Sequence, residues 1–231
     1  MSNPGRRVLV CDDELQILRA LKVVLRDAGF EVEATATARE ALDSAAIRPP
    51  DAAIIDLMLP DGSGVEVCRQ LRSWSEMPIV VLSAIGDEDQ KVEALEAGAD
   101  DYVTKPFGPR ELVARLNAVL RRAGEAVDEP AVAIDGLHVD LAGRVVKRDG
   151  QEIHLTPIEY DLLRVLLRNR GRLMTHRALL TEVWGPGYGT ESNLLHVNVS
   201  QLRRKIEPDR AQPQYLITEP GAGYRLVEPT P

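Results

Sequence analysis

Five short apolar runs constrain the fold of the first half of this chain, because a stretch with helical spacing separates each run from the next. The runs are "RVLVC" (7–11), "FEVEATA" (30–36), "AAIID" (52–56), "PIVVLS" (78–83) and "DYVTK" (101–105). Strands that alternate with helices form parallel sheets with right-handed crossovers. We therefore predict an α/β domain built on a doubly wound, five-stranded parallel sheet.

Polar side chains stand at the ends of four of these runs, at the sheet edge where ligands gather. Asp12 and Asp13 follow the first run, and Asp56, Ser83 and Lys105 end three later ones. Three carboxylates would repel one another unless a hard cation lay among them, and oxygen ligands with room for water suit Mg²⁺. A lysine and a hydroxyl complete a pocket for a small dianion. The pattern predicts that Asp56 is a nucleophile that accepts a phosphoryl group.

The motifs "VLVCDDE", "IIDLMLPDGSG", "VVLSA" and "GADDYVTKPF" resemble the receiver domain of two-component response regulators, and the likeness spans residues 1–123. The resemblance implies a CheY-like fold, phosphorylation on Asp56 by a sensor histidine kinase, and contact of Ser83 and Lys105 with the phosphoryl group. It implies that Tyr102 swings inward when Ser83 moves, and that the Lys105–Pro106 peptide is cis. The implied Mg²⁺ ligands are Asp13 and Asp56 directly, Asp12 through water, and the backbone carbonyl of Met58.

The same resemblance implies that phosphorylation favours a symmetric homodimer. Its face would be formed by residues 88–98, 101–104 and 109–122, and the small apolar residues of the first segment suit an interface that forms and dissolves. The family's charge pairs have these counterparts here: Lys91 with Glu111, Asp101 with Arg115, and Asp100 with Arg122.

The hydrophobic period disappears at 124–130, where Gly, Pro and acidic residues predict a tether to a second domain, 131–231. Asp-Gly and Ala-Gly turns then favour an antiparallel ribbon. After the ribbon, Thr156 and Glu159 form the capping-box pattern of a helix that starts at Pro157. Two more helices and a hairpin follow, which favours a winged helix-turn-helix.

The distribution of charge separates this second domain from the rest. The whole chain carries a net charge of −8, which argues weakly against nucleic acid as a partner. Residues 164–205, however, contain eight Arg or Lys against two acids. A basic final helix can merely complement its own dipole, but with the helix order and hairpin present we expect it to bind double-stranded DNA.

The segments "LTPIEYDLLRVLLRNRGRLMTHRALLTEVWG", "QLRRKIEP" and "ITEPGAGYRL" resemble the OmpR/PhoB-type DNA-binding domain. Within that family, "EVWGPGYGTES" is most similar to the regulators of potassium-uptake operons. The resemblance implies tandem DNA half-sites and RNA polymerase as a partner.

Helical periodicity predicts how the helix near 192–206 meets DNA. If Leu195, Val199, Leu202 and Ile206 face the core, then Asn193, Val197, Ser200 and Arg204 face outward. We expect Val197 to contact a thymine methyl, with Ser200 and Gln201 reading base edges; alternatively, Val197 packs against a neighbouring element. The remaining predicted DNA contacts are Asn198, the phosphate-binding residues Arg203, Arg204 and Lys205, and Arg225 in the hairpin.

Other classes of protein fit less well. No apolar run reaches the ~18 residues of a membrane span, so we expect a cytoplasmic protein without a membrane partner. Cys11 and Cys68 are expected in the core, and the four histidines lack the spacing of a zinc site. A Mg²⁺-dependent phosphohydrolase would need a general acid where Met58 stands, so we expect no enzyme. A protein-interaction switch without DNA binding is disfavoured by the basic segment.

Overall fold

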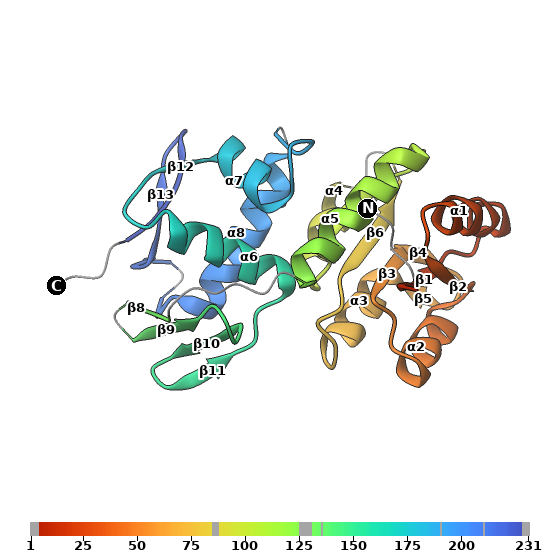
Figure 1. Cartoon of the computed structure of the whole chain (residues 1–231), viewed down its shortest axis with the longest axis horizontal. Coiled ribbons are helices and arrows are strands. Elements are labelled where there is room, and N and C mark those ends of the chain that lie inside the picture. The colour runs from red at the N-terminus through yellow and green to blue at the C-terminus, as the bar shows by residue number, and fades with distance from the viewer. Residues whose placement is uncertain are drawn as a thin grey trace. The chain divides into compact units, whose positions relative to one another are not determined.

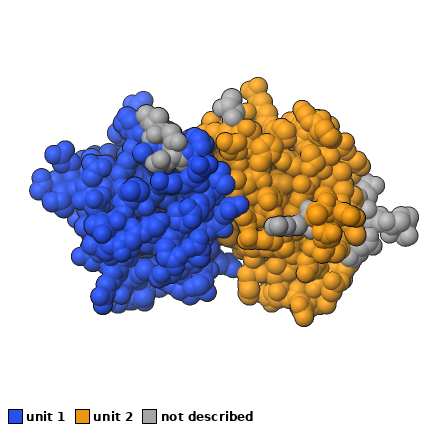
Figure 2. Space-filling model, turned by 180° about the vertical axis from the view of Figure 1, so that it is seen from behind, with its two compact units in different colours: residues 1–123 blue, residues 124–231 orange. Residues whose placement is uncertain are grey.

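The computed structural model describes residues 5–84, 88–124, 131–134, 136–189, 191–209 and 211–227. The chain divides into two compact units, residues 1–123 and residues 124–231, which Figure 2 colours separately. The predicted tether begins on Gly124, the last residue of a helix, and its residues 125–130 lie outside the described part of the chain.

The first unit contains a five-stranded parallel sheet in the order β2-β1-β3-β6-β7 (Figure 1). This confirms the predicted doubly wound fold, and each strand matches its predicted run to within one residue at either end. The central strands are buried along their whole length, as expected of a sheet covered on both faces. The strands are β1 (Arg7–Cys11), β2 (Glu31–Thr35), β3 (Ala52–Asp56), β6 (Ile79–Ser83) and β7 (Asp101–Thr104).

Helices α1 (Leu15–Asp27) and α5 (Pro109–Gly124) pack on one face of this sheet in a single apolar core. Leu18, Leu21 and Leu25 of α1 are buried there, as their spacing predicts. On the other face lie α2 (Ala38–Ile47) and α3 (Gly64–Arg72), with α4 (Glu88–Glu96) packed beside α3. A small hairpin of β4 (Met58–Leu59) and β5 (Gly62–Ser63) follows β3.

The second unit opens with a four-stranded antiparallel sheet, in which turns at Gly136, Gly143 and Gly150 join successive strands. Its strands are β8 (Val132–Ile134), β9 (Leu137–Asp140), β10 (Val145–Arg148) and β11 (Gln151–Ile153). Helices α6 (Pro157–Arg168), α7 (His176–Val183) and α8 (Ser192–Ile206) follow. A small sheet of β12 (Met174–Thr175), β14 (Gly223–Leu226) and β13 (Leu216–Glu219) closes the unit.

The capping box that the sequence predicts at the start of α6 is present. The hydroxyl of Thr156 accepts from the amide of Glu159, whose carboxylate accepts from the amide of Thr156. The hairpin of β13 and β14 corresponds to the wing of the predicted DNA-binding domain, and its residue Gly223 faces β12, where any Cβ would overlap the carbonyl of Met174. The hairpin β13–β14 therefore packs tightly against β12, and β14 also contacts α6, in the arrangement of a winged helix-turn-helix. No helix among the described residues is long and apolar enough to cross a lipid bilayer.

Candidate functional sites

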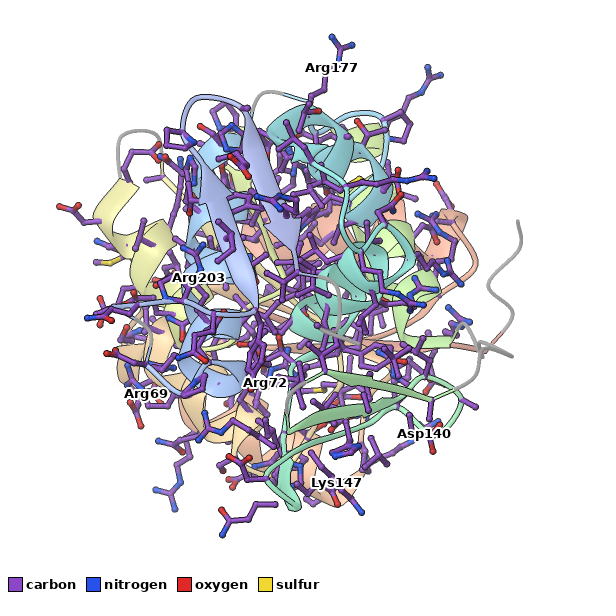
Figure 3. All side chains as sticks on the ribbon, turned by 90° about the vertical axis from the view of Figure 1, so that its left-hand side faces the viewer. Arg69, Arg72, Asp140, Lys147, Arg177 and Arg203 are labelled. Carbon is purple, nitrogen blue, oxygen red and sulfur yellow. The ribbon has the colours of Figure 1, made fainter. Side chains whose placement is uncertain are left out.

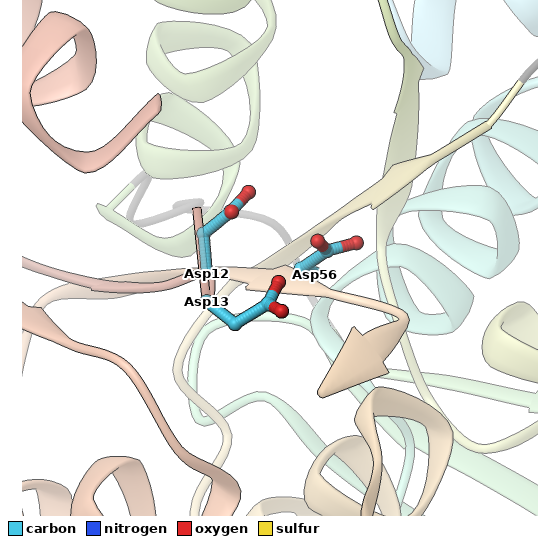
Figure 4. Close-up of side chains that lie close together, drawn as sticks. All are labelled: Asp12, Asp13 and Asp56. Carbon is cyan, nitrogen blue, oxygen red and sulfur yellow. The ribbon is translucent and has the colours of Figure 1, made fainter. Parts of the chain in front are cut away.

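An acidic cluster lies at the carboxyl edge of the parallel sheet (Figure 4). Asp12 and Asp13 follow β1, and Asp56 ends the neighbouring strand β3. One carboxylate oxygen from each of the three lies within 4.8 Å of the others. Asp12 and Asp56 are buried whereas Asp13 is exposed. The strand order therefore brings together the three acids that the sequence singles out.

Lys105, directly after β7, is the cation of this cluster. Its Nζ donates to Oδ2 of Asp56 at 2.7 Å and to Oδ2 of Asp12 at 2.8 Å. Burial raises the pKa of Asp56 above its ordinary value, although the ammonium of Lys105 opposes the shift. Burial alone would lower the pKa of Lys105, but its bonds to the two carboxylates outweigh burial and raise that pKa. The lysine therefore stays charged and holds one oxygen of Asp56.

The hydroxyl of Ser83 ends β6, the strand beside β3. Ser83 is 1% exposed, and its Oγ has no hydrogen-bond partner among the described residues. A buried hydroxyl without a partner costs free energy, so this group is available to a ligand at the strand ends. Gly64 approaches the backbone of Asp56 so closely that a Cβ would overlap the Asp56 carbonyl. The loop after β3 is thereby fixed against the acid.

The donor set fits a divalent cation. Three carboxylates supply oxygen ligands of the kind that Mg²⁺ prefers, and the exposed Asp13 leaves room for water. The backbone of Met58 lies beside them, because its amide is 3.4 Å from Oδ1 of Asp56. Oδ1 is thus the less engaged oxygen of Asp56. The predicted cis peptide is present between Lys105 and Pro106.

Most residues of the expected dimer face make ion pairs within one chain. Lys91 pairs with Glu88 at 2.9 Å, and its Nζ lies 5.1 Å from the ring centroid of the half-buried Tyr102. Arg115 donates to Asp101 and to Glu111, each at 3.2 Å. The side chain of Arg122 lies outside the described residues.

Asp100 is the most deeply engaged acid of the expected charge pairs that the structure describes in detail. Its carboxylate is 1% exposed and accepts from the guanidinium of Arg72 at 2.6 Å and from the amide of Ile79 at 2.8 Å. These bonds join the start of β7 to α3 and β6. Asp100 is therefore a buried acid that joins three elements of one chain, and its expected pairing with Arg122 across a dimer interface stays a prediction.

Helix α8 has the rotational phase that the sequence predicts. Leu195, Val199, Leu202 and Ile206 are buried. On the opposite side Asn193, Ser200 and Arg204 are exposed, while Val197 is partly buried. These outward residues remain available to DNA.

Two predicted base contacts on α8 require correction. Asn198 is 2% exposed and donates to the carbonyl of Leu194 at 2.8 Å, and Gln201 is 6% exposed. Both side chains face inward, because α8 packs against α6 and α7 and its buried arc is wider than a single apolar stripe. Neither can reach a base edge from this position.

Several predicted phosphate contacts already have partners within the second unit. Arg203 lies against the wing (Figure 3), where its Nε donates to the carbonyl of Leu216 at 3.0 Å. Lys205 donates to the capping-box residue Glu159 at 2.6 Å. Arg225 donates to Glu219 at 3.0 Å, within the hairpin. Of the basic triplet at the end of α8, Arg204 is the exposed member.

The sequence reasoning missed His196. This residue is exposed on α8, and its Nδ1 lies 2.7 Å from the hydroxyl of Tyr224 in β14. The signal was its spacing, three residues after Asn193 and four before Ser200, which places it beside the outward face.

Comparisons with known proteins agree with this architecture. The family model described as "Response regulator receiver domain" matches residues 8–117, and "Transcriptional regulatory protein, C terminal" matches residues 150–226. The transcriptional regulatory protein KdpE of Mycobacterium tuberculosis is 52% identical over 221 residues, which cover 95% of this chain and 98% of the relative. The KDP operon transcriptional regulatory protein KdpE of Escherichia coli is 48% identical with the same coverage.

Solved structures lead to the same family. A RitR mutant aligns with a TM-score of 0.77 and 27% identity, over 97% of this chain and 100% of that one. The response regulator DrrB of Thermotoga maritima, described as an OmpR/PhoB homologue, aligns with a TM-score of 0.52 and 30% identity. This alignment also covers 97% of this chain and 100% of the other. The chain therefore belongs to the OmpR/PhoB family of two-component response regulators, in which phosphorylation of a receiver domain regulates transcription through a DNA-binding domain.

Proposed function

We propose that Asp56 is the residue that becomes phosphorylated and that a sensor histidine kinase supplies the phosphoryl group. One observation carries this assignment: the Asp56 carboxylate lies beside two further acids and a lysine, with the unpartnered hydroxyl of Ser83 at the end of the adjacent strand. No other described cluster of three such acids exists in the chain.

The less engaged oxygen of Asp56, Oδ1, is the attacking atom. A bond forms between this oxygen and phosphorus while the bond between phosphorus and the kinase's histidine nitrogen breaks. Lys105 and Ser83 then donate to the phosphoryl oxygens, which is why the serine hydroxyl stands free before the reaction. Asp13 and Asp56 directly, Asp12 through water and the Met58 carbonyl would hold Mg²⁺, which would offset the charge of roughly −1.5 to −2 that the modification adds.

Labelling with a small phosphodonor tests the assignment. The full chain, incubated with acetyl phosphate and Mg²⁺, should gain the mass of one phosphoryl group, and Asp56→Asn should gain none. Asp43→Asn is the matched control, because Asp43 is an exposed acid of the same unit. Equal labelling of Asp56→Asn would reject the assignment, and omission of Mg²⁺ should slow labelling of the wild type.

We infer that phosphorylation promotes a homodimer through the face of α4, β7 and α5, where Asp101, Glu111 and Arg115 form a charge network. Such a dimer binds two DNA half-sites about one helical turn apart, ~10–11 base pairs between centres. In this family the half-sites are direct repeats, and the bound regulator contacts RNA polymerase. If footprinting showed that a single isolated half-site is bound at full affinity, that result would contradict the paired arrangement.

We also infer a cytoplasmic regulator of genes for potassium uptake. The support is the name of the relative that is 48% identical, a KDP operon regulator, together with the segment from Glu182 to Ser192. A gel shift should show that the phosphorylated chain prefers DNA upstream of a potassium-uptake operon over an unrelated promoter of equal length. Equal affinity for both would reject this target while leaving the phosphorylation site untouched.

A further inference from the structure

The segment between helix α6 and strand β12 carries a positive charge that neither of the sites above uses. Residues 168–173, here named the arginine turn, contain three arginines and no acid. All three arginines are exposed, and the Leu173 that follows them exposes 47% of its surface. Arg168 ends α6 and therefore complements the dipole of that helix. Arg170 and Arg172 lie beyond the helix, and neither side chain bonds to another described residue.

The backbone of the arginine turn is held in one conformation. The amide of Arg172 donates to the Asn169 carbonyl at 3.0 Å. Gly171 adopts a φ of 75°, which favours glycine, and its amide donates to the Leu226 carbonyl at 2.8 Å. The turn is therefore tied to β14 as well as to the end of α6. A turn that is already fixed loses little conformational entropy when a partner binds the side chains that it presents.

The arginine turn lies at the end of β14 that is remote from the turn of the wing, residues 220–222. The amide of His176 donates to the carbonyl of Ala222 in the turn of the wing, whereas Gly171 bonds to Leu226 at the other end of the strand. The four residues of β14, at about 3.3 Å each, separate these two points by roughly 13 Å. We therefore expect the arginine turn to stay exposed when the turn of the wing meets DNA.

We propose that the arginine turn docks an acidic segment of RNA polymerase. This inference deepens the polymerase contact of the proposed function and rests on it. Guanidinium groups form paired hydrogen bonds with carboxylates, and arginine is enriched at protein interfaces whereas lysine is depleted. The three charges are spread over five residues of chain, which suits several carboxylates rather than one small anion. Leu173 supplies an apolar contact beside them.

The surface is small, but the partner is close. A regulator that binds promoter DNA holds the arginine turn near the polymerase, so the contact forms at a high effective concentration. A few charge-assisted hydrogen bonds and one leucine are then sufficient, although they would be too weak for two proteins that meet free in solution.

Two affinities measured with the full chain separate this surface from the DNA contacts. A duplex is selected from random sequences with the phosphorylated wild type and immobilised, and purified RNA polymerase holoenzyme is titrated onto the complex by biolayer interferometry. Arg170→Glu and Arg172→Glu should each weaken polymerase binding on the order of tenfold, because hydrogen bonds to carboxylates become repulsion. Leu173→Ser should lose a smaller factor. The matched control is Lys147→Glu, at an exposed lysine of β10, which should bind polymerase like the wild type.

Photo-crosslinking identifies the segment that is docked. Leu173 is replaced by a benzophenone amino acid, and mass spectrometry of the irradiated complex should locate a polymerase peptide rich in Asp and Glu. Polymerase affinity at the wild-type level in both arginine variants would overturn the proposal. So would a loss of DNA affinity as large as the loss of polymerase affinity, which would assign the arginine turn to the DNA backbone. If the wild-type complex bound no polymerase, the polymerase contact of the proposed function would itself be rejected.

Discussion

The ammonium of Lys105 lies 2.7 Å from Oδ2 of Asp56, across the strand β6 that separates β3 from β7 in the sheet. A residue from the end of β7 therefore reaches the end of β3 at the sheet edge. This bond fixes one carboxylate oxygen and leaves the other for chemistry. It also means that Asp56 shares this ammonium with Asp12, whose Oδ2 lies 2.8 Å from the same nitrogen.

Removing the ammonium of Lys105 should make the stability of the receiver domain depend on Mg²⁺. We expect Lys105→Met to lower the free energy of unfolding by about 1–3 kcal/mol in EDTA, because two buried carboxylates lose their donor. Added Mg²⁺ should then restore more stability than it adds to the wild type, since it binds the folded state selectively. Urea titrations with and without Mg²⁺ measure both effects. Arg19→Met, at an exposed site on α1, is the control; an equal Mg²⁺ effect in all three proteins would contradict the prediction.

Two arginines of α3 should differ sharply in their contribution to stability. Arg72, with a side chain 10% exposed, donates to Asp100 and to the carbonyls of Gly98 and Met77. Arg72→Met leaves the Asp100 carboxylate buried without this partner, and we expect a loss of about 3–5 kcal/mol. Arg69 pairs with Glu66 at the surface, where such pairs contribute roughly 0–1 kcal/mol. Urea unfolding of both variants compares them, and similar losses would be inconsistent with this difference.

Reversing one charge should test the proposed dimer face. In a single chain Arg115 joins Asp101 to Glu111, and Arg115→Glu breaks both pairs. We expect the variant to dimerise at least several-fold more weakly than the wild type in the presence of a phosphate mimic, because the substitution reverses a charge of this face beside the acid Glu111. Sedimentation velocity measures this, with Arg19→Glu as the control on α1 and circular dichroism to verify folding. Dimerisation at wild-type strength would exclude that face.

Acidification should strengthen DNA binding through His196. Burial lowers the pKa of this histidine in the free protein, so it is neutral at pH 7 and gains a proton as the pH falls through that lowered pKa. A bound phosphate favours the charged ring, and we expect affinity to rise between pH 7.5 and 5.5 in the wild type but less in His196→Asn. His176, Arg203 and Tyr224 also face the ring. The variant His176→Gln shows how much of the pH dependence comes from the second histidine.

Acidification should have the opposite effect on folding, because protonation of His196 lowers the free energy of unfolding. Because the folded-state pKa of His196 is depressed, its contribution to stability is present above the unfolded-state pKa and is lost as pH falls through the folded value. Parallel pH titrations of affinity and of urea midpoint would show whether the two trends diverge. An affinity of the wild type that follows His196→Asn at every pH would remove the histidine from the interface.

The thiols of Cys11 and Cys68 should not react with alkylating agents until the receiver domain unfolds. Burial raises the pKa of Cys11 to about 11 and that of Cys68 to about 12. At pH 8 both are therefore protonated as well as inaccessible, and thiolate is the reactive form. Iodoacetamide should modify neither in the native protein and both in urea, as mass spectrometry can verify. Fast labelling of native protein would show that β1 or α3 opens more easily than this packing allows.

Local sequence determined the elements and their order. Strand runs, the capping box at Thr156 and Glu159, and the phase of α8 follow from periodicity and from bonds between residues that are close in the chain. The clustering of Asp12, Asp13 and Asp56 followed as well, because parallel strands must end at one edge.

The partners of charged and polar side chains were decided only by tertiary structure. Nothing near Asp100 in sequence indicates its bond to Arg72, and nothing near Lys205 indicates Glu159. Asn198 and Gln201 turned inward because helices from elsewhere in the chain cover α8 on two sides. His196 acquired its orientation from Tyr224, 28 residues away. Periodicity specifies which face of an element is apolar, whereas a hydrogen bond forms only between the particular groups that packing brings within about 3 Å of each other.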